Sequence, residues 1–238
     1  MKIALIGYGK MGHAIEEIAL QRKHSIVLKV SIDNTEDNTV ENISKADVAI
    51  EFTGPDSAFD NINRCFEAEV PVVSGSTGWL NRYEEAVWNC KAQNGALLYA
   101  SNFSIGVNIF FEVNKKLAQL MASQKDYNAT IEETHHTQKK DAPSGTAITL
   151  AEQILAVSPF KKQLVNKETN KASDLQIISK RIDPAPGTHR ILYHSDTDDI
   201  EIIHTAHNRS GFALGAVLAA EFLYGRRGVF TMSDVLGL

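Results

Sequence analysis

Short apolar runs alternate with helical stretches over the first hundred residues of the chain. Residues 2–6, 25–32 and 47–52 are rich in isoleucine, valine and leucine, and helical segments follow the first and the third of these runs. Two further runs, at residues 70–73 and 96–99, extend the pattern. Apolar runs of this length between helices are typical of strands buried in a parallel sheet. The pattern predicts an α/β fold with a doubly wound parallel sheet of the Rossmann type.

The pattern changes after a predicted helix at residues 105–121. Residues 175–181, 189–194 and 199–204 alternate between apolar and polar side chains, as strands of an antiparallel sheet with one covered face do. An apolar helix is predicted at residues 212–224, where it returns to the first domain. The second part of the chain is therefore predicted to form a smaller α+β domain with an open sheet, mixed or antiparallel.

These patterns give the predicted domain boundaries. Residues 1–104 and 211–238 form the parallel-sheet domain, and residues 105–210 form the smaller domain. A chain of 238 residues is long enough for both parts to bury a core.

A glycine-rich loop follows the first apolar run directly. Its sequence is Gly7-Tyr8-Gly9-Lys10-Met11-Gly12, a helical stretch comes next, and the following strand ends near Asp33. Glycines here let the backbone approach a pyrophosphate, and an acid about twenty residues later binds the ribose hydroxyls. A glycine-rich turn without a nucleotide is the alternative. The strand before the loop and the helix after it favour a dinucleotide site, so the parallel-sheet domain is predicted to bind one.

Asp33 bears on which nucleotide binds. A carboxylate at this place accepts hydrogen bonds from a free 2′-hydroxyl and repels a 2′-phosphate, which favours NADH. Asn34 and Thr35 offer no arginine to meet a 2′-phosphate, whereas Lys10 offers a positive charge. We therefore predict NADH as the favoured cofactor, with NADPH as the alternative.

Small polar residues follow several of the predicted strands. Such residues are ordinary turn formers, but at the carboxyl edge of a doubly wound sheet they also lie where a cofactor binds. With the glycine loop and the acid, they complete the set of predicted cofactor-binding residues: Gly7, Tyr8, Gly9, Lys10, Met11, Gly12, Asp33, Phe52, Thr53, Gly75, Ser76, Thr77, Ser101, Asn102, Phe103 and Ser104.

A cationic loop lies between a strand that includes Glu133 and a helix that begins at Gly145 with Ser144 as its N-cap. Free N–H groups at a helix start bind carboxylates or phosphates. An isolated histidine is usually structural and paired lysines usually face solvent, but here both lie together beside a helix start. The loop therefore predicts a site for a small anion with more than one carboxylate, beside proton-transfer groups. These groups are His135, His136, Lys139 and Lys140. Adjacent side chains of an extended chain point to opposite sides, so the two histidines are expected to have different roles.

The composition excludes several classes of function. The net charge of -5 argues against a nucleic-acid partner, because the basic residues of the loop are local. Cys65 and Cys90 match neither a metal-ligand spacing nor a disulfide framework, so no metal is expected and a reducing cytoplasm is the simplest compartment. The N-terminus lacks the apolar run of a signal peptide, and the apolar helix at residues 212–224 is too short to span a bilayer.

With these residues in view, the chain resembles the dihydrodipicolinate reductase family from end to end. The most specific part is His135-His136 with Lys139 and the run Asp141-Ala142-Pro143-Ser144-Gly145-Thr146-Ala147. Phe52-Thr53, Gly75-Ser76-Thr77-Gly78, the run from Asn102 to Asn108 and Arg209-Ser210-Gly211-Phe212 also match. Two features depart from the family: the glycine loop is one residue shorter, and the frequent arginine after the ribose acid is absent. Both bear on the nucleotide preference and not on the reaction.

The resemblance implies the activity and the roles of individual residues. It implies reduction of a cyclic 4-hydroxy dicarboxylate, with loss of water, to tetrahydrodipicolinate in the biosynthesis of diaminopimelate and lysine. It also implies that the sheet of the smaller domain builds a homotetramer. His135 is expected to be a proton donor or acceptor and Lys139 a proton donor. The residues expected to hold the substrate are His136, Ser144, Gly145 and Thr146.

Two other kinds of protein share parts of this pattern. One is a different two-domain dehydrogenase that acts on an aldehyde or an amino-acid semialdehyde. An acylating version of it needs an activated cysteine, and neither Cys65 nor Cys90 lies near a plausible base or at a strand–turn site. A non-catalytic NAD(H) sensor would lack the proton-transfer groups that this chain keeps.

Overall fold

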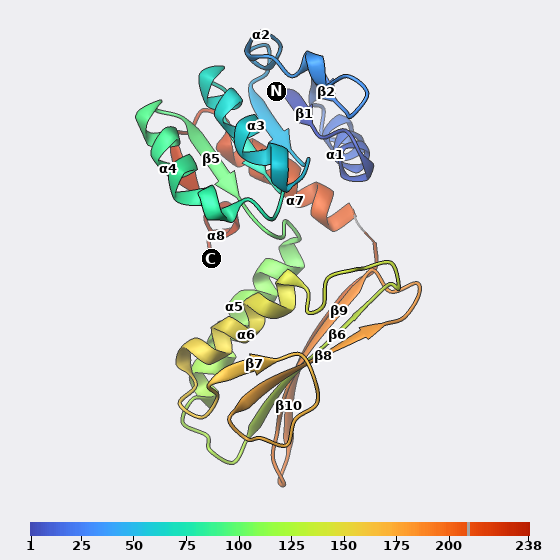
Figure 1. The fold of residues 1–238 in the computed structure, drawn as a ribbon, viewed down its shortest axis with the longest axis vertical. Helices are drawn as coiled ribbons and strands as arrows, with labels where there is room; N and C mark the ends of the chain where they lie inside the picture. Colours follow the sequence, from blue (N-terminus) through green and yellow to red (C-terminus); the bar gives the residue numbers. More distant parts are fainter. Residues whose placement is uncertain (209) are drawn as a thin grey trace. The chain divides into compact units, whose positions relative to one another are not determined.

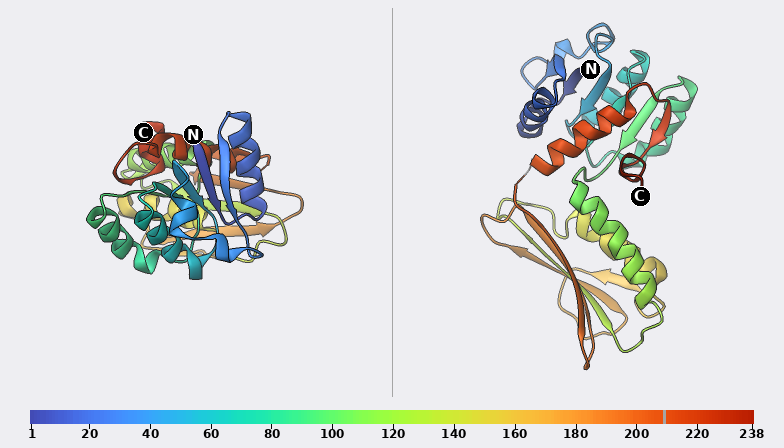
Figure 2. Two further views of the ribbon diagram at one scale, coloured as in Figure 1. Left: turned by 90° about the horizontal axis from the view of Figure 1, so that it is seen from above. Right: turned by 180° about the vertical axis from the view of Figure 1, so that it is seen from behind.

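The computed structural model describes residues 1–208 and 210–238. The chain forms two compact units, which Figures 1 and 2 trace by colour along the sequence. Unit 1 contains Met1–Ile105 and Ser210–Leu238, and unit 2 contains Gly106–Arg209. Unit 1 is therefore built from both ends of the chain, whereas unit 2 is one continuous segment.

Unit 1 is built on a parallel sheet of six strands in the order β11-β5-β4-β3-β1-β2. This confirms the predicted Rossmann-type sheet. The short edge strand β11 was not predicted, because three residues show no periodicity. The strands are β1 (Lys2–Ile6), β2 (Ser25–Val30), β3 (Val48–Glu51), β4 (Val72–Ser74), β5 (Ala96–Tyr99) and β11 (Gly228–Phe230).

Helices cover both faces of this sheet. Alternate residues of each strand point to opposite faces, and both sets are mostly apolar. In β1, Ile3 and Leu5 pack with buried residues of α1 and α7, while Ala4 and Ile6 pack with those of α3 and α4. Apolar residues on both faces explain why the strands appear in the sequence as continuous runs. The helices of unit 1 are α1 (Lys10–Gln21), α2 (Val40–Ile43), α3 (Pro55–Glu67), α4 (Tyr83–Ala92), α7 (Ser210–Leu223) and α8 (Met232–Leu236), with 3₁₀ turns at Thr35–Asp37 and Leu80–Arg82.

Small residues let α7 lie close to the loop after β5. Ala213, Ala216 and Ala220 are fully buried in the core that α7 shares with α1. A Cβ atom at Gly215 would lie 1.7 Å from the carbonyl oxygen of Phe103. Glycine is therefore required where this helix crosses the loop.

Unit 2 is built on a five-stranded mixed sheet with the order β10-β9-β6-β8-β7. Strand β9 pairs antiparallel with β6 and β10, whereas β8 pairs parallel with β6 and β7. The mixed sheet is one of the two arrangements predicted for this unit, since side-chain alternation alone cannot show the direction of a strand such as β8. The strands are β6 (Asn128–His135), β7 (Gln163–Val165), β8 (Asp174–Arg181), β9 (Gly187–His194) and β10 (Asp199–Ala206).

Two helices, α5 (Ile105–Met121) and α6 (Gly145–Val157), cover one face of this sheet. Ala129 and Ile131 of β6 pack into the core beneath them. Because β6 alternates, Glu133 and His135 lie on the same covered face and are buried. This alternation places two ionisable side chains at the end of an otherwise apolar row.

Among the described residues, no helix is both long and apolar enough to cross a membrane.

Candidate functional site

The glycine loop of unit 1 turns directly from β1 into α1. Gly7 has a φ of +102°, and a Cβ atom there would lie 2.1 Å from the carbonyl oxygen of Phe52. Only glycine fits this conformation and this approach. Gly9 is the N-cap of α1, makes no side-chain cap, and has open space where a side chain would be. The first N–H groups of α1 are therefore available to an anion, as a pyrophosphate site requires.

A cavity of about 720 Å³ lies over this loop and the carboxyl ends of β2 and β3. Six predicted cofactor-binding residues line it: Gly7, Tyr8, Gly9, Asp33, Phe52 and Thr53. The face of α3 that carries Asp56, Asp60 and Arg64 completes the lining. The cavity thus brings together the predicted pyrophosphate loop and the predicted ribose acid, and adds a guanidinium that the sequence analysis had not assigned.

The remaining predicted cofactor residues lie elsewhere in unit 1. Lys10 and Thr77 are exposed, and Met11 packs against the core of the α1 face. Phe103 is buried in the same core, where its ring centroid lies 5.5 Å from that of Phe52. The other members of this group line no part of the cavity: Gly12, Gly75, Ser76, Ser101, Asn102 and Ser104.

A buried carboxylate organises the loops after β3 and β4. Glu51 is fully buried and accepts hydrogen bonds from the hydroxyls of Ser74 (2.6 Å) and Ser76 (2.7 Å). It also accepts from the backbone N–H of Thr53 (2.9 Å) and from its hydroxyl. Glu51 was not singled out from the sequence, where it ends an apolar run like any strand-terminal residue. It holds two predicted cofactor-binding residues in place.

Asp33 is exposed in the turn after β2. The side chain of Asn34 is committed to this turn, because it accepts from the Ser31 N–H (2.7 Å) and donates to the Lys29 carbonyl (2.9 Å). Asn34 therefore stabilises the turn, which leaves the Asp33 carboxylate as the charged group at the end of β2.

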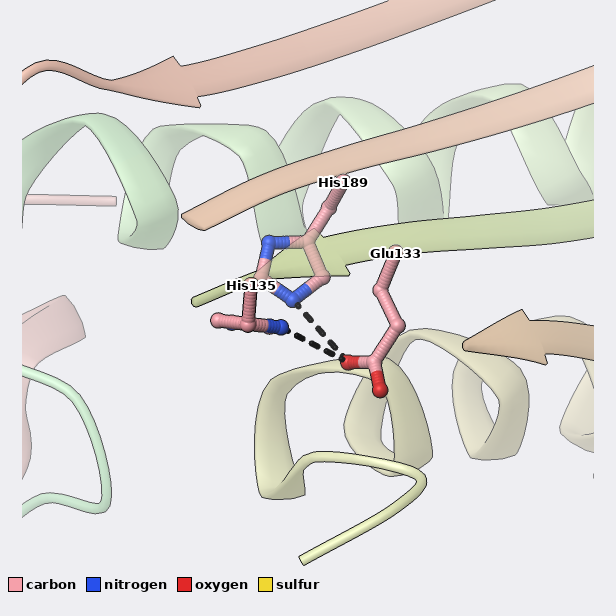
Figure 3. Close-up of side chains that lie close together, drawn as sticks. All are labelled: Glu133, His135 and His189. Carbon is pink, nitrogen blue, oxygen red and sulfur yellow. Dashed lines mark ion pairs between the residues drawn. The ribbon is translucent and has the colours of Figure 1, made fainter. Parts of the chain in front are cut away.

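In unit 2, three buried ionisable side chains point toward one another at the ends of β6 and β9 (Figure 3). Oε2 of Glu133 lies 3.5 Å from Nδ1 of His135 and 3.7 Å from Nε2 of His189. The two imidazole rings meet edge to face, with centroids 5.1 Å apart. Glu133 and His189 face each other across the antiparallel pairing of β6 with β9.

The Glu133 carboxylate also contacts the start of α6 and a cation of β8. The Ser144 N–H donates to both of its oxygens, at 3.1 and 3.2 Å, and a guanidinium nitrogen of Arg181 lies 3.4 Å from Oε1. Burial opposes ionisation of Glu133, but contacts with His189 and Ser144 outweigh it and hold the pKa of this carboxyl well below its usual range. The charge of Glu133 is thus satisfied inside the unit.

Burial lowers the pKa of His135 to about 4, although the charge of Glu133 acts in the opposite direction. Because an ordinary histidine titrates near pH 6.5, His135 is neutral at physiological pH in this structure. A neutral imidazole can accept a proton at one nitrogen and donate a hydrogen bond from the other.

The loop between β6 and α6 is held by an ion pair within it and by contacts with Arg181 and Asp183. Nζ of Lys139 pairs with Asp141 at 2.8 Å, and Arg181 donates to the carbonyl oxygens of Lys139 and Asp141. Asp183 accepts from the Thr137 N–H at 3.0 Å and from its hydroxyl at 2.6 Å. A loop rich in cations is thereby fixed at both ends.

The predicted helix start is confirmed. Ser144 is the N-cap of α6, and its hydroxyl accepts from the Ala147 N–H at 3.2 Å and lies 3.3 Å from Nε2 of His189. Gly145 is exposed and Thr146 is half-buried in the first turn. His136 follows the last residue of β6 and is half-buried. Three of the four predicted substrate-binding residues, Ser144, Gly145 and Thr146, thus lie at one helix start.

Glu133, His135 and His189 offer three metal-ligand atoms within 4.8 Å of one another. The geometry suits a small cation, but the charge balance does not, because Arg181 and the Ser144 N–H already contact the carboxylate. The cluster of Glu133, His135 and His189 is therefore better suited to orienting the two imidazoles than to binding a metal ion.

Sequence reasoning missed Glu133, His189 and Arg181 as members of this cluster. Glu133 could have been found, because it lies two residues before His135 in an alternating strand and so shares its face. His189 and Arg181 lie on other strands, and their approach depends on a register that the sequence does not display. Arg209, which belongs to the late family motif, lies outside the described residues.

Two family models match this chain. The model described as dihydrodipicolinate reductase, N-terminus, matches residues 1–103, and the model described as dihydrodipicolinate reductase, C-terminus, matches residues 106–236. Together they cover almost the whole chain.

Curated relatives and a solved structure agree with these matches. A 4-hydroxy-tetrahydrodipicolinate reductase of Christiangramia forsetii is 52% identical over 236 residues, which cover 99% of this chain and 98% of the relative. The enzyme of the same name from Neisseria meningitidis serogroup C is 33% identical, over 94% of this chain and 84% of the relative. A dipicolinate-bound dihydrodipicolinate reductase from Paenisporosarcina sp. TG-14 has the same fold, with a TM-score of 0.74 at 22% identity over 98% of both chains.

Proposed function

The chain belongs to the dihydrodipicolinate reductase family, and from this premise we propose how its residues carry out the reaction. It is an oxidoreductase that reduces 4-hydroxy-tetrahydrodipicolinate with a nicotinamide nucleotide, in the biosynthesis of diaminopimelate and lysine. The net reaction consumes a hydride and a proton and releases water. The match over both units is the observation that carries this conclusion.

The start of α6 holds the substrate carboxylates. The N–H groups of Gly145 and Thr146 lie in the first turn of α6, where the helix dipole favours an anion. The hydroxyls of Ser144 and Thr146 and the imidazole of His136 add further donors. Binding both carboxylates fixes the ring in one orientation before chemistry begins.

Lys139 and His135 carry out the proton transfers. Lys139 is the proton donor, since its ammonium is partly buried on the loop beside the helix start and pairs with Asp141. His135 acts as a proton acceptor or as a neutral hydrogen-bond donor, because burial keeps it uncharged at physiological pH. The bound nucleotide supplies the hydride.

Unit 1 binds this nucleotide, and NADH is the favoured form. The glycine loop and the free N-terminus of α1 suit the pyrophosphate, and the Asp33 carboxylate suits the free ribose hydroxyls. Arg64 lines the same cavity and provides a positive charge that a 2′-phosphate can use, so NADPH is the second candidate.

Unit 2 assembles into a homotetramer through the open face of its sheet. Ile178, Leu192 and Ile203 alternate with the covered residues of their strands, and Ile203 is 55% exposed. Apolar side chains on an uncovered sheet face favour association with a second copy of the same surface.

The test is an assay with the purified full-length protein. Loss of nicotinamide absorbance should depend on 4-hydroxy-tetrahydrodipicolinate and should continue until the limiting reactant is consumed. Oxidation of NADH and NADPH at equal rates with and without this substrate would contradict the proposal.

A further inference from the structure

We propose that Glu133 is a positioning residue for the reduction, because its one carboxylate orients the ring of His135 and fixes the start of α6. This inference rests on the proposed function, which assigns proton transfer to His135 and carboxylate binding to the start of α6. Glu133 does not contact the substrate itself, since it is fully buried.

The first contact sets the orientation of the imidazole. Nδ1 of His135 lies 3.5 Å from Oε2 of Glu133 and makes no hydrogen bond to any described residue, so this carboxylate is its nearest charged neighbour across an ion-pair distance. A carboxylate accepts hydrogen bonds only, so the neutral ring is most stable with its proton on Nδ1. Nε2 then keeps its lone pair and can accept a proton from a bound ligand.

The opposite edge of the ring is kept clear by a glycine. A Cβ atom at Gly187 would lie 3.2 Å from Nε2 of His135 and 3.3 Å from Cδ2, which is tighter than ordinary packing allows. Glu133 on one side and the bare backbone of Gly187 on the other therefore define the ring position while leaving Nε2 unobstructed.

The second contact ties the same carboxylate to the anion site. The Ser144 N–H donates to both oxygens of Glu133, so the N-cap of α6 cannot move independently of the carboxylate. His189 lies between the two parts, 3.7 Å from Oε2 of Glu133 and 3.3 Å from the Ser144 hydroxyl. The buried Glu133 carboxylate thus fixes the position of the proton-transfer group relative to the residues that hold the substrate.

Four charged or titratable groups surround His135, each on a different segment of the chain. Glu133 lies on its own strand, His189 on β9 and Arg181 on β8, while Lys139 lies on the loop that follows β6. The Glu133 carboxylate is the group among these that favours the imidazolium, and the other three oppose it. Removal of the Glu133 charge should therefore make His135 harder to protonate.

The test combines a side-chain NMR measurement with kinetics on the full-length protein. The ¹⁵N resonances of the His135 ring are assigned by comparison with His135→Gln and measured at neutral pH, which needs no substrate. In the wild type we expect the proton on Nδ1. In Glu133→Gln, which keeps the size of the side chain but can donate as well as accept, we expect the proton to move to Nε2 or to exchange between the two nitrogens.

The kinetic arm measures kcat and KM across pH. Glu133→Gln should lower kcat/KM on the order of a hundredfold, because oriented acid–base catalysis is typically worth ~10²–10⁴-fold. The pH limb assigned to His135 should move to lower pH. The matched control is Glu152→Gln, which removes the same charge from an exposed position on α6 and should leave the tautomer and the pH profile unchanged.

Two outcomes would overturn the inference. One is a wild-type His135 that carries its proton on Nε2 at neutral pH, a result that does not depend on the folding of any variant. The other is a folded Glu133→Gln variant with an unchanged tautomer and unchanged kcat/KM. If the wild type does not reduce the substrate, the proposed function fails, whereas the NMR measurement still decides whether Glu133 orients His135.

Discussion

Lys139 is the residue whose loss we expect to reduce turnover most. Its ammonium pairs with Asp141 on a loop that Arg181 holds in place, so Lys139→Ala should remove the proton donor without unfolding the loop. We expect kcat to fall roughly a hundredfold or more, with nucleotide affinity unchanged. Steady-state kinetics and a nucleotide titration measure the two effects. Lys116→Ala, which removes an exposed lysine of α5, is the control, and near-normal turnover in Lys139→Ala would remove Lys139 from its assigned role.

Thr146 tests the anion site in the same way. Thr146→Val keeps the shape of the side chain but deletes its hydroxyl from the first turn of α6. A hydrogen bond to a charged group is worth about 1.5–3 kcal/mol, so substrate KM should rise roughly tenfold to a hundredfold while kcat changes less. The control is Thr197→Val, in the exposed turn between β9 and β10. An unchanged KM would mean that the carboxylates bind elsewhere.

Asp33 decides the nucleotide preference. Asp33→Ala should weaken NADH binding, because the ribose hydroxyls lose an acceptor, and should leave NADPH binding equal or tighter, because one repulsive charge is gone. Titration of both nucleotides against wild type and variant measures this. A wild type that prefers NADPH more than tenfold, or about 1.4 kcal/mol, would show that Arg64 and Lys10 outweigh Asp33.

For single residues, the sequence identified those whose role depends on neighbours in the chain. Ser144 was predicted as an N-cap because capping depends on neighbours in the chain, and the structure confirms it. Glu133, Arg181 and His189 meet only through the pairing of three strands, so their cluster depends on register. Glu51 was also missed, because its hydrogen-bond partners come from the ends of two different strands.

Among the elements, α7 passes close to the loop after β5 at Gly215. Gly215→Ala would place a methyl group 1.7 Å from the Phe103 carbonyl oxygen, so the helix must shift. We expect this change to destabilise the protein by about 1–3 kcal/mol, the usual range for overpacking. The matched control is Gly211→Ala on the same helix, where the nearest atom would lie 3.9 Å away. Gly211→Ala should be neutral or stabilising, because alanine is the better helix former.

Chemical denaturation of the two variants measures the difference. Equal stabilities for Gly215→Ala and Gly211→Ala would show that α7 has room to move at this point. The sequence could indicate α7 as an apolar helix but could not indicate which glycine meets the loop, because that depends on packing between segments more than a hundred residues apart. The short strands β7 and β11 escaped prediction because three residues carry too little pattern.

For the whole molecule, the open face of the unit 2 sheet is the surface whose change should alter assembly. Ile203→Glu replaces an exposed apolar side chain of this face with a charge and should shift the protein to smaller species in light scattering. Leu20→Glu, at a similarly exposed residue of α1 in unit 1, is the control and should leave the assembly unchanged. An unchanged mass for Ile203→Glu would argue against this face as the interface.

The division of the chain into units also bears on how the protein is made. Residues 1–105 leave the ribosome with strands β1 to β5, but α7 and β11, which complete their sheet and core, are encoded last. Unit 2 is continuous and can fold as soon as it emerges, because domains generally fold as units. The middle of the chain can therefore finish folding before its beginning does. During that interval the apolar sheet face that α7 later covers is exposed on the nascent chain.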